Sequence, residues 1–507
     1  MTSHRDLSRS DATRLMCAGT YSDPGFRKKI IQEFQTLAHR VAPSYGYDAV
    51  PVLAHALAAQ RLRFIQVALT AGGAGVAVVL WMAGLTGFLG MLFLLGFAAW
   101  TFSFLRRLVV IETLVTRLKA EPFTGAYPQT SALTSDLIDR VAREQAVDGV
   151  IYYGGYKPFV GAGEAVKEWS NAQVLLPARV DPVAAAIGRK NGDGAAGGTI
   201  ANSHESGRII SFSTEEITAF VERRLLTALR EEAAQDRKVE GLTIERPRYR
   251  QAFGFGQPQP GGGSVGSDTV HWREDYHAAR EYLCVRVGSW NQELVTSMFV
   301  GFDLRGETLY TEFHTYVLPP IKAGYHLVDR LPTVLGGKIL RRAAWDAFKA
   351  VVARAFVPLA WLITFIDLTV ESAKQRAAER AAETVNRVPA GGELNLSAYA
   401  LPVFGRGAAV SIRELAASPV YHHFFQKSDA DKYMKIVERC LLEAVETFLR
   451  DHNVDLADHA VFQNTILGDV IAHHGTGHIS SRNSGTQTQG DGSPIHAAAG
   501  KGMGGSS

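Results

Sequence analysis

The sequence predicts a mixed α/β (α+β) cytoplasmic region attached to a transmembrane α-helical hairpin and followed by a disordered, Gly-rich C-terminal tail. Three observations predict this class. Residues 64–105 form a 42-residue run without a charged side chain, enough for two membrane crossings of roughly 20 residues each. Segments rich in β-branched and aromatic residues then alternate with amphipathic helical segments, as in mixed folds. The last 45 residues contain 10 glycines and few charges.

The composition narrows the class of protein further. The 507 residues carry 53 Lys and Arg against 50 Asp and Glu, a net charge of +3. This balance excludes a polybasic nucleic-acid binder, and we expect no nucleic-acid partner. Cys17, Cys284 and Cys440 lie far apart in the sequence, which excludes a disulfide framework or a cysteine zinc site and indicates a reducing compartment.

Residues 1–63 are predicted to form a cytoplasmic N-terminal segment, because they are largely polar and contain no signal peptide. The hairpin follows over 64–105, with crossings over about 64–83 and 87–105. Gly84 and Gly87 lie between the crossings and supply the backbone angles of a tight reversal. One continuous helix would be about 63 Å long, twice the hydrocarbon thickness.

Positive charges flank the hairpin on both sides and none lies in its turn, so both termini are expected in the cytoplasm of a multi-pass plasma-membrane protein. We place the membrane interface at Arg61, Arg63, Trp81, Trp100, Arg106 and Arg107. No ionisable residue lies within the hairpin, which favours an anchor over a transport path. Small residues over 68–75 permit either close packing within the hairpin or self-association.

The region 106–253 is predicted to be an α/β region. Residues 149–156 and 172–176 have the composition of strands, and residues 188–207 that of a flexible loop. Ser213 and Glu216 have the spacing of a helix-capping box, and Phe212 with Ile217 that of a hydrophobic staple. A Gly/Pro linker over 254–268 ends the region.

The region 269–462 is predicted to hold a β-hairpin followed by helices. Strands over 297–302 and 307–318 flank a turn at 303–306, and a helical pattern runs over 338–386. Residues 355–366 are uncharged but too short to cross a bilayer, so they indicate a buried or membrane-surface helix. Another helix is expected to start at Ser428–Asp431, with Cys440 on its buried stripe. Ser428 as cap and Asp431 as first-turn charge are favoured over a metal pair formed by Asp429 and Asp431.

The tail over 463–507 is predicted to be largely disordered. β-prone residues near 465–479 favour a short edge strand, with docking or self-assembly as the alternative. His473, His474 and His478 cluster there, but intervening glycines argue against a helical ligand pair, and we predict no metal site.

A candidate ligand-binding loop follows the strand near 150. Gly154, Gly155, Lys157, Gly161 and Gly163 lie within ten residues. Backbone N–H groups of such glycines, with a nearby lysine, are able to cradle a phosphate group. This loop has neither a Walker motif nor a GxGxxG motif, so a tight turn beside the strand is the stronger interpretation. We predict no catalytic residues, because nucleophile-elbow, HExxH and kinase signatures are also absent.

Two stretches carry a family resemblance. Residues 150–163 resemble a segment common to large actinobacterial membrane proteins of unassigned function, and residues 411–415, Tyr421, 425–427 and 436–439 are similar to their C-terminal region. The resemblance implies a two-crossing membrane protein and carries no catalytic residues.

These observations favour a membrane-anchored cytoplasmic interaction, signalling or scaffold protein without a cofactor. Its expected partners are the lipid bilayer and a protein partner, or a second copy bound through the hairpin or the tail. The alternative is a membrane-tethered enzyme or ligand-binding protein that holds a phosphorylated small molecule at the Gly154–Gly163 loop. A third hypothesis is a subunit of a transport or secretion assembly.

Overall fold

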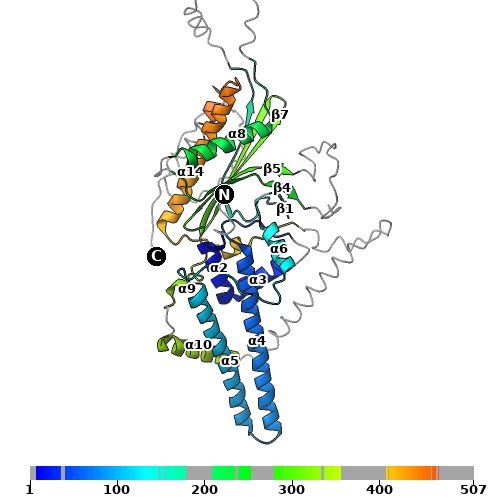
Figure 1. The fold of residues 1–507 in the computed structure, drawn as a ribbon, viewed down its shortest axis with the longest axis vertical. Coiled ribbons are helices and arrows are strands. Elements are labelled where there is room, and N and C mark those ends of the chain that lie inside the picture. Colours follow the sequence, from blue (N-terminus) through cyan, green and yellow to red (C-terminus); the bar gives the residue numbers. More distant parts are fainter. Residues whose placement is uncertain are drawn as a thin grey trace, which may run out of the picture. The chain divides into compact units, whose positions relative to one another are not determined.

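The computed structural model groups residues 1–460 in one compact unit and residues 461–507 in a second (Figure 1). It describes residues 7–35, 40–147, 149–154, 156–178, 208–233, 238–252, 279–332, 336–355, 407–408, 410–457, 459–463 and 466. The predicted loop over 188–207, the linker over 254–268, residues 356–366 and the histidine cluster of the tail lie outside the described residues.

The N-terminal part is a helical base that holds the hairpin. Helices α2 (Asp11–Ser22) and α3 (Pro24–Gln35) pack on α4 (Ala49–Met82), and one apolar core joins all three. The Asp48 carboxylate caps α4 by accepting a hydrogen bond from Val50 N–H. The first turns of α4 are therefore buried in the base, and the same helix continues without a break into the apolar run.

The two apolar helices are confirmed, and they are longer than the sequence indicated. Helix α4 (Ala49–Met82) and helix α5 (Phe88–Arg117) are long and apolar enough to cross a membrane, and only 11% and 6% of their most apolar windows is buried. Core helices of soluble proteins bury their apolar residues, whereas Met82 and Leu89 here are 69% and 79% exposed. The reversal over 83–87 uses Gly84 in a left-handed conformation, with φ +73°.

Close packing inside the hairpin explains the presence of one of its small residues, Gly73. A Cβ on Gly73 would lie 3.0 Å from the Ala98 Cβ, so this glycine lets α4 and α5 approach each other. Near the basic flanks, Gln66 Nε2 donates to Ser103 Oγ at 2.9 Å. Gly72 and Gly75 face open space.

The central element is a five-stranded antiparallel sheet with the order β2-β8-β7-β6-β3. Its strands are β2 (Glu164–Val174), β3 (Leu242–Glu245), β6 (Leu283–Ser289), β7 (Leu294–Arg305) and β8 (Thr308–Leu318). A smaller sheet has the order β1-β4-β5, from β1 (Val150–Tyr153), β4 (Arg248–Gln251) and β5 (Arg280–Glu281). The large sheet therefore draws strands from both sides of the predicted linker.

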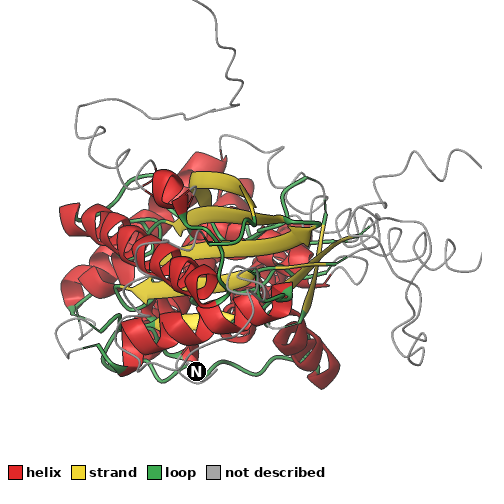
Figure 2. Ribbon diagram, turned by 90° about the horizontal axis from the view of Figure 1, so that it is seen from above, coloured by secondary structure: helices red, strands yellow, loops and turns green. Residues whose placement is uncertain are grey.

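Alternation along the strands gives the large sheet two buried faces. Leu309 and Phe313 of β8 face a core shared with α8 (Thr214–Leu226) and α14 (Phe424–Asp451). Leu318 and Phe299 face the opposite core, which the small sheet and the loop after β1 complete. Figure 2 shows helices flanking the strands. Burial on both faces explains why these strands are rich in apolar residues.

The predicted turn at 303–306 is wrong by three residues. Strand β7 continues through Arg305, and the chain reverses at Gly306 and Glu307. Gly306 adopts φ +58° there. A two-residue turn matches the twist of the strands that it joins, so residues 303–305 remain in the ladder.

The remaining helices include one that starts earlier than predicted. Helix α6 (Ser135–Glu144), the π-helical turn η3 (Thr227–Glu231), α9 (Leu327–Arg330), α10 (Gly337–Ala355) and α13 (Ile412–Ala416) complete the described elements. Helix α14 begins at Phe424 rather than at Ser428, because the Gln426 side chain accepts hydrogen bonds from the backbone N–H groups of His422 and His423. By contrast, the capping box of α8 at Ser213 and Glu216 is confirmed.

Candidate functional site

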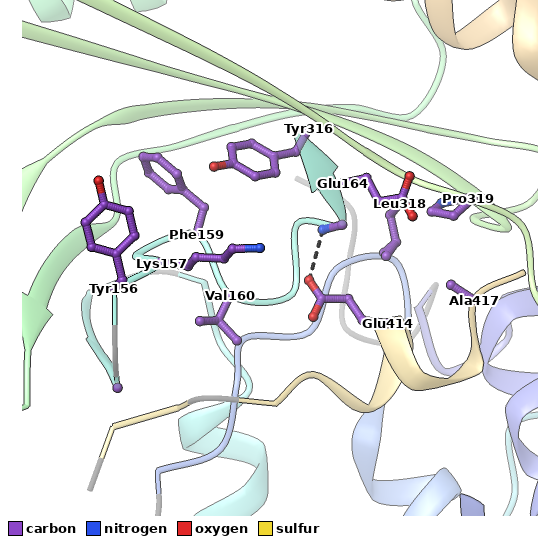
Figure 3. Close-up of a pocket in the computed structure, with 12 residues that line it drawn as sticks. Tyr156, Lys157, Phe159, Val160, Glu164, Tyr316, Leu318, Pro319, Glu414 and Ala417 are labelled. Carbon is purple, nitrogen blue, oxygen red and sulfur yellow. Dashed lines mark hydrogen bonds between the residues drawn. The ribbon is translucent and has the colours of Figure 1, made fainter. Parts of the chain in front are cut away.

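A pocket of about 400 Å³ lies beside the loop between β1 and β2 (Figure 3). The described residues that line it come from this loop, from the end of β8 and from α13. They are Gly154, Tyr156, Lys157, Phe159, Val160, Gly163, Glu164, Tyr316, Leu318, Pro319, Glu414 and Ala417. The predicted loop thus borders this pocket.

Two backbone hydrogen bonds fix the start of the loop. At its start, Gly154 N–H donates to Ala408 O at 2.9 Å, and Ala408 N–H donates to Tyr152 O at 2.8 Å. Gly407 lies so close to Tyr153 that a Cβ would be 2.1 Å from its carbonyl carbon. The loop therefore leaves β1 beside a segment more than 250 residues later in the chain.

Phe159 anchors the middle of the loop. Its ring stacks on Phe299 with a centroid distance of 4.1 Å and meets Tyr249 and Tyr282 edge to face. The side chain is only 5% exposed. Buried aromatic clusters of this kind hold a backbone segment in one position.

The glycine N–H groups predicted to cradle a phosphate already donate to a carboxylate. Gly161 N–H and Gly163 N–H donate to Glu414 Oε1 at 2.9 and 3.1 Å. Both glycines have positive φ values, +93° and +101°, and their N–H groups, two residues apart, point to the same carboxylate oxygen. The anion in this cradle is therefore an internal one, supplied by α13.

Burial raises the pKa of the Glu414 carboxyl above its usual value, although the bonds from Gly163 and Gly161 and the charge of Lys157 oppose the shift. Burial likewise raises the pKa of Tyr316, and the charges of Glu168 and Glu414 add to this effect. The pocket thus contains one ammonium group, two carboxylates and several aromatic rings.

Of the five predicted ligand residues, Gly154, Lys157 and Gly163 line the pocket, and Gly155 lies outside the described residues. Gly161 does not line the pocket, but its N–H donates to the lining Glu414. Sequence reasoning missed Glu164, Tyr316 and Glu414 as members of the site. Glu414 lies in a stretch that carried the family resemblance, but no local spacing connects it to a loop 251 residues earlier.

The six predicted interface residues lie on the hairpin helices. Trp100 has a specific partner, because its Nε1 donates to Ala344 O of α10 at 3.1 Å. In the helical base, Arg27 of α3 is buried, and its side chain donates to Thr20 O. Burial and the charges of Arg63 and Arg106 lower the pKa of Arg27 to about 10. Several cations therefore gather where the apolar helices meet the base.

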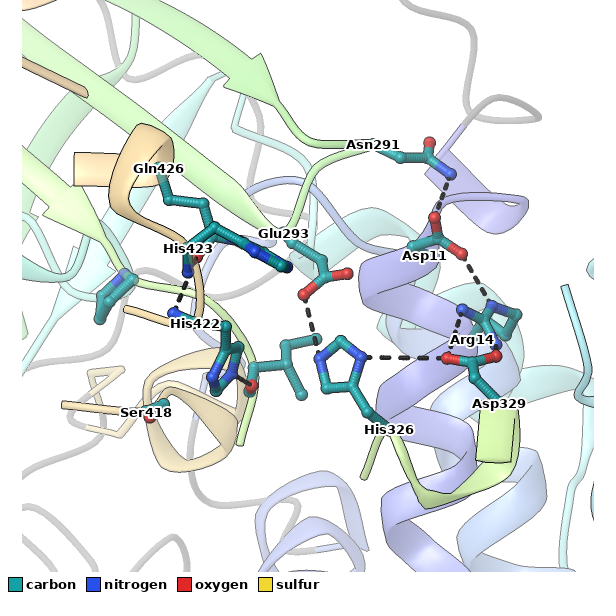
Figure 4. A network of polar contacts seen from close by, with 12 residues as sticks. Asp11, Arg14, Asn291, Glu293, His326, Asp329, Ser418, His422, His423 and Gln426 are labelled. Carbon is teal, nitrogen blue, oxygen red and sulfur yellow. Dashed lines mark hydrogen bonds and ion pairs between the residues drawn. The ribbon is translucent and has the colours of Figure 1, made fainter. Parts of the chain in front are cut away.

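A second polar cluster connects the base to the sheet (Figure 4). Arg14 of α2 forms ion pairs with Asp11 and Asp329, and its Nη1 donates to Leu118 O at the end of α5. His326 Nε2 lies 3.2 Å from Glu293 Oε2 and its Nδ1 lies 3.9 Å from Asp329 Oδ2. This cluster joins four segments that are distant in sequence.

The turn that carries Glu293 is conformationally unusual. Trp290, Asn291 and Gln292 all have positive φ values, between +51° and +70°, which costs free energy for residues other than glycine. Trp290 Nε1 donates to Asp429 Oδ2 at 3.1 Å, and Asn291 Nδ2 donates to Asp11 Oδ2 at 2.8 Å. These bonds hold the turn in place, and they give Asp429 a structural partner.

Among the residues that the structure describes, no group of three His, Cys, Asp or Glu side chains has the arrangement of a metal site. Cys17 and Cys284 are buried and Cys440 is half-buried. Burial raises the pKa of the Cys440 thiol above its usual value, which reduces its reactivity at neutral pH.

One family model, described as the AbeC-like domain, matches residues 168–485, more than half of the chain. The chain belongs to this family. The AbeC-like region starts within β2 and includes β8 and α13, so it contains Tyr316 and Glu414 but not Lys157 or the hairpin. No curated protein and no solved structure matches the chain.

Proposed function

We propose that the chain is a membrane-anchored interaction protein, and that the pocket beside the Gly154–Gly163 loop binds a basic side chain of a protein partner. The observation that carries the proposal is the bond pair from Gly161 and Gly163 to Glu414. Because the carboxylate occupies the N–H cradle, the pocket has an acidic and aromatic lining rather than a free anion site.

The hairpin supports the anchoring part of this proposal. Both α4 and α5 are mostly exposed along their apolar segments, and both enter the same core at their other ends, through Leu53 and Leu118. A bilayer would cover the exposed apolar side chains at no cost in polar burial. Basic flanks on both helices favour a cytoplasmic location for the base and the sheet. The resemblance to two-crossing actinobacterial membrane proteins implies the same topology.

The lining supports a basic ligand group. Glu164 and Glu414 contribute two carboxylates, against the single ammonium of Lys157. The rings of Tyr156, Phe159 and Tyr316 border the same space, as Figure 3 shows. An ammonium or guanidinium group gains from both carboxylates and ring faces, whereas a phosphate would meet two like charges.

Exposed aromatic residues near the pocket support a macromolecular partner. Tyr156 is 96% exposed at the pocket rim. Val420, Phe424 and Phe425 are 67%, 80% and 66% exposed and follow shortly after Ala417, which lines the pocket. Exposed apolar and aromatic side chains of this density mark protein interaction surfaces more often than ordinary solvent-facing surface.

The test is ligand binding to the full-length protein in lipid nanodiscs, with N-acetyl-arginine amide, N-acetyl-lysine amide, the neutral N-acetyl-glutamine amide, inorganic phosphate and ATP as probes. The two basic amides should bind, and Glu164→Gln should weaken their binding about two- to fivefold, since it removes an exposed ion-pair partner worth up to about 1 kcal/mol. Glu168→Gln, on the same strand but outside the pocket lining, is the matched control.

The phosphorylated-ligand alternative predicts a different result. It requires phosphate or ATP to bind and Lys157→Ala to abolish this binding, with no preference for the basic amides. That outcome would replace the present proposal by the enzyme or ligand-binding hypothesis.

A further inference from the structure

Helix α10 (Gly337–Ala355) runs across α5 rather than along it, as Figure 1 shows. The buried side chains on its contact side are small, Ala343 and Ala347, at 5% and 0% exposure. The carbonyl of the intervening Ala344 accepts the hydrogen bond from Trp100 Nε1. This contact fixes α10 at one level of the hairpin.

Another side of α10 exposes large apolar residues. Trp345, Phe348 and Val352 follow i, i+3, i+7 spacing and are 58%, 48% and 38% exposed. The Trp345 and Phe348 rings stack on each other with a centroid distance of 5.5 Å. An amphipathic helix normally buries such a face, and here the residues that the structure describes leave it uncovered.

The polar residues of α10 are strongly basic. Lys338, Arg341, Arg342 and Lys349 are exposed, and the sequence of the helix has a single acidic residue, Asp346. Asp346 pairs with Lys349 at 2.8 Å. The hydrogen bond from Lys349 lowers the pKa of Asp346, and the charges of Lys349, Arg107 and Arg342 add to the shift. The helix therefore lies near the basic flank of the hairpin.

The position of the contact on α5 gives the depth of α10. Trp100 precedes Arg106 by six residues, or about 9 Å along the helix axis. If the basic flank lies among the lipid headgroups, α10 lies about 9 Å from the headgroups toward the bilayer centre. Amphipathic helices that bind membranes in the interface plane bury their apolar faces about 5–10 Å into the boundary between headgroups and acyl chains.

We infer that α10 is an in-plane helix whose apolar face inserts into the cytoplasmic leaflet and whose basic residues bind anionic lipid headgroups. This inference rests on the membrane anchoring proposed above. It assigns a lipid surface to a segment that the hairpin prediction did not include, and it makes the depth of the anchor sensitive to lipid charge.

Two features favour lipid over a second copy of the chain as the occupant. Two α10 helices facing each other would bring eight exposed cations together around their apolar faces. The contact with α10 also lies within an aromatic stretch of α5, because Trp100, which donates to Ala344 O, lies between the rings of Phe97 and Phe104. Phe97 is itself 51% exposed. One bilayer surface would cover both helices.

The test uses nitroxide spin labels on single cysteines in the full-length protein, in a Cys440→Ser background. Labels replace Phe348 on the apolar face, the exposed Ala353 on another side of α10, and Leu89 in the hairpin. The protein is placed in nanodiscs of phosphatidylcholine, with or without phosphatidylglycerol. Collision with oxygen reports immersion in lipid, and collision with a water-soluble nickel chelate reports exposure to water.

The label at 348 should have an oxygen-to-nickel collision ratio severalfold higher than the label at 353. Phosphatidylglycerol should raise the ratio at 348 further, and the double substitution Lys338→Gln and Arg342→Gln should remove this lipid dependence. A label at 348 exposed to water, with the label at 89 in lipid, would overturn the inference and leave the anchor intact. A water-exposed label at 89 would overturn the anchor itself. Short label-to-label distances at 348 between copies would identify a second copy as the occupant.

Discussion

At the scale of single residues, the loop beside the pocket depends on glycines whose backbone no other residue can adopt at low cost. Gly163 has φ +101°, and a Cβ there would lie 2.3 Å from Val317 O and 2.7 Å from Leu318 Cα. The positive φ strains any residue other than glycine, and the short distances from a Cβ force the β8 backbone to move. The same geometry points the Gly163 N–H at Glu414.

We therefore predict that Gly163→Ala lowers the free energy of unfolding by about 2–4 kcal/mol, because it adds backbone strain and a steric clash. Gly306→Ala is the matched control, since Gly306 has φ +58° with no atom near the missing Cβ. It should cost about 1 kcal/mol from backbone strain alone. Denaturant unfolding of the purified protein in detergent measures both, and equal losses would contradict the clash.

At the scale of elements, helix starts provide a test of local rules. Ser213 Oγ accepts from Glu216 N–H at 3.2 Å, while the Glu216 carboxylate accepts from Ser213 N–H at 2.7 Å. Ser213→Ala should cost about 1 kcal/mol because it removes this cap. Ser428→Ala should change the stability by about 0.5 kcal/mol or less, because Ser428 lies inside α14 and alanine favours helix. A larger loss of stability for Ser428→Ala than for Ser213→Ala would contradict the start of α14 at Phe424 and favour the start at Ser428 predicted from the sequence.

These two serines also show which helix starts the sequence could predict: the cap at Ser213 was predicted correctly, and the start at Ser428 was not. Periodicity and capping chemistry are local, so the strands near 150 and 309, the capped α8 and the apolar hairpin were predictable. The start of α14 was missed because its stabilising group, Gln426, is a less common capping partner than the Ser-x-x-Asp pattern that follows. The Gly154–Gly163 loop was located correctly, but the role of Glu414 depends on a contact across the fold and not on spacing.

The contact between α9 and the β6–β7 turn includes a histidine whose pKa is raised. His326 lies between Glu293 of the turn and Asp329 of α9, with Arg14 of α2 and the ring of His422 also facing it. The bond with Glu293 raises the pKa of His326 above its usual 6.5; the charges of Glu293 and Asp329 add to this, and burial opposes it. A raised pKa means that the folded state holds the proton more tightly than the unfolded state.

We predict that the stabilisation from His326 is fully present below pH 6.5 and is lost as the pH rises through the raised pKa. His326→Gln should flatten this part of the pH profile of unfolding free energy, measured by denaturant titration at a series of pH values. His314→Gln, on β8 outside the cluster, should leave the slope in place. If His326→Gln leaves the pH dependence of the unfolding free energy unchanged, this dependence belongs to another group.

At the scale of the whole molecule, the helical base connects the two contact surfaces proposed above, the pocket for a protein partner and the helices that face the membrane. Residues that precede the hairpin, residues that follow it and residues of the AbeC-like region share one core, through Leu53, Leu118 and Ile412. Arg14 adds polar contacts to the end of α5 and to α9. Both ends of the hairpin therefore enter the same folded unit, and if the hairpin spans a bilayer, that unit lies on one side of it.

This arrangement predicts the topology of two exposed positions. In a Cys440→Ser background, the native Cys17 and Cys284 are buried and should not react. A cysteine replacing Leu85, which is 73% exposed in the hairpin turn, should react with a membrane-impermeant maleimide in intact cells. A cysteine replacing Tyr156, at the pocket rim, should react only after the membrane is permeabilised, because the basic flanks retain that side in the cytoplasm. Labelling of both positions in intact cells, or of both only after permeabilisation, would show that the hairpin does not cross, since the turn and the pocket would then share one compartment.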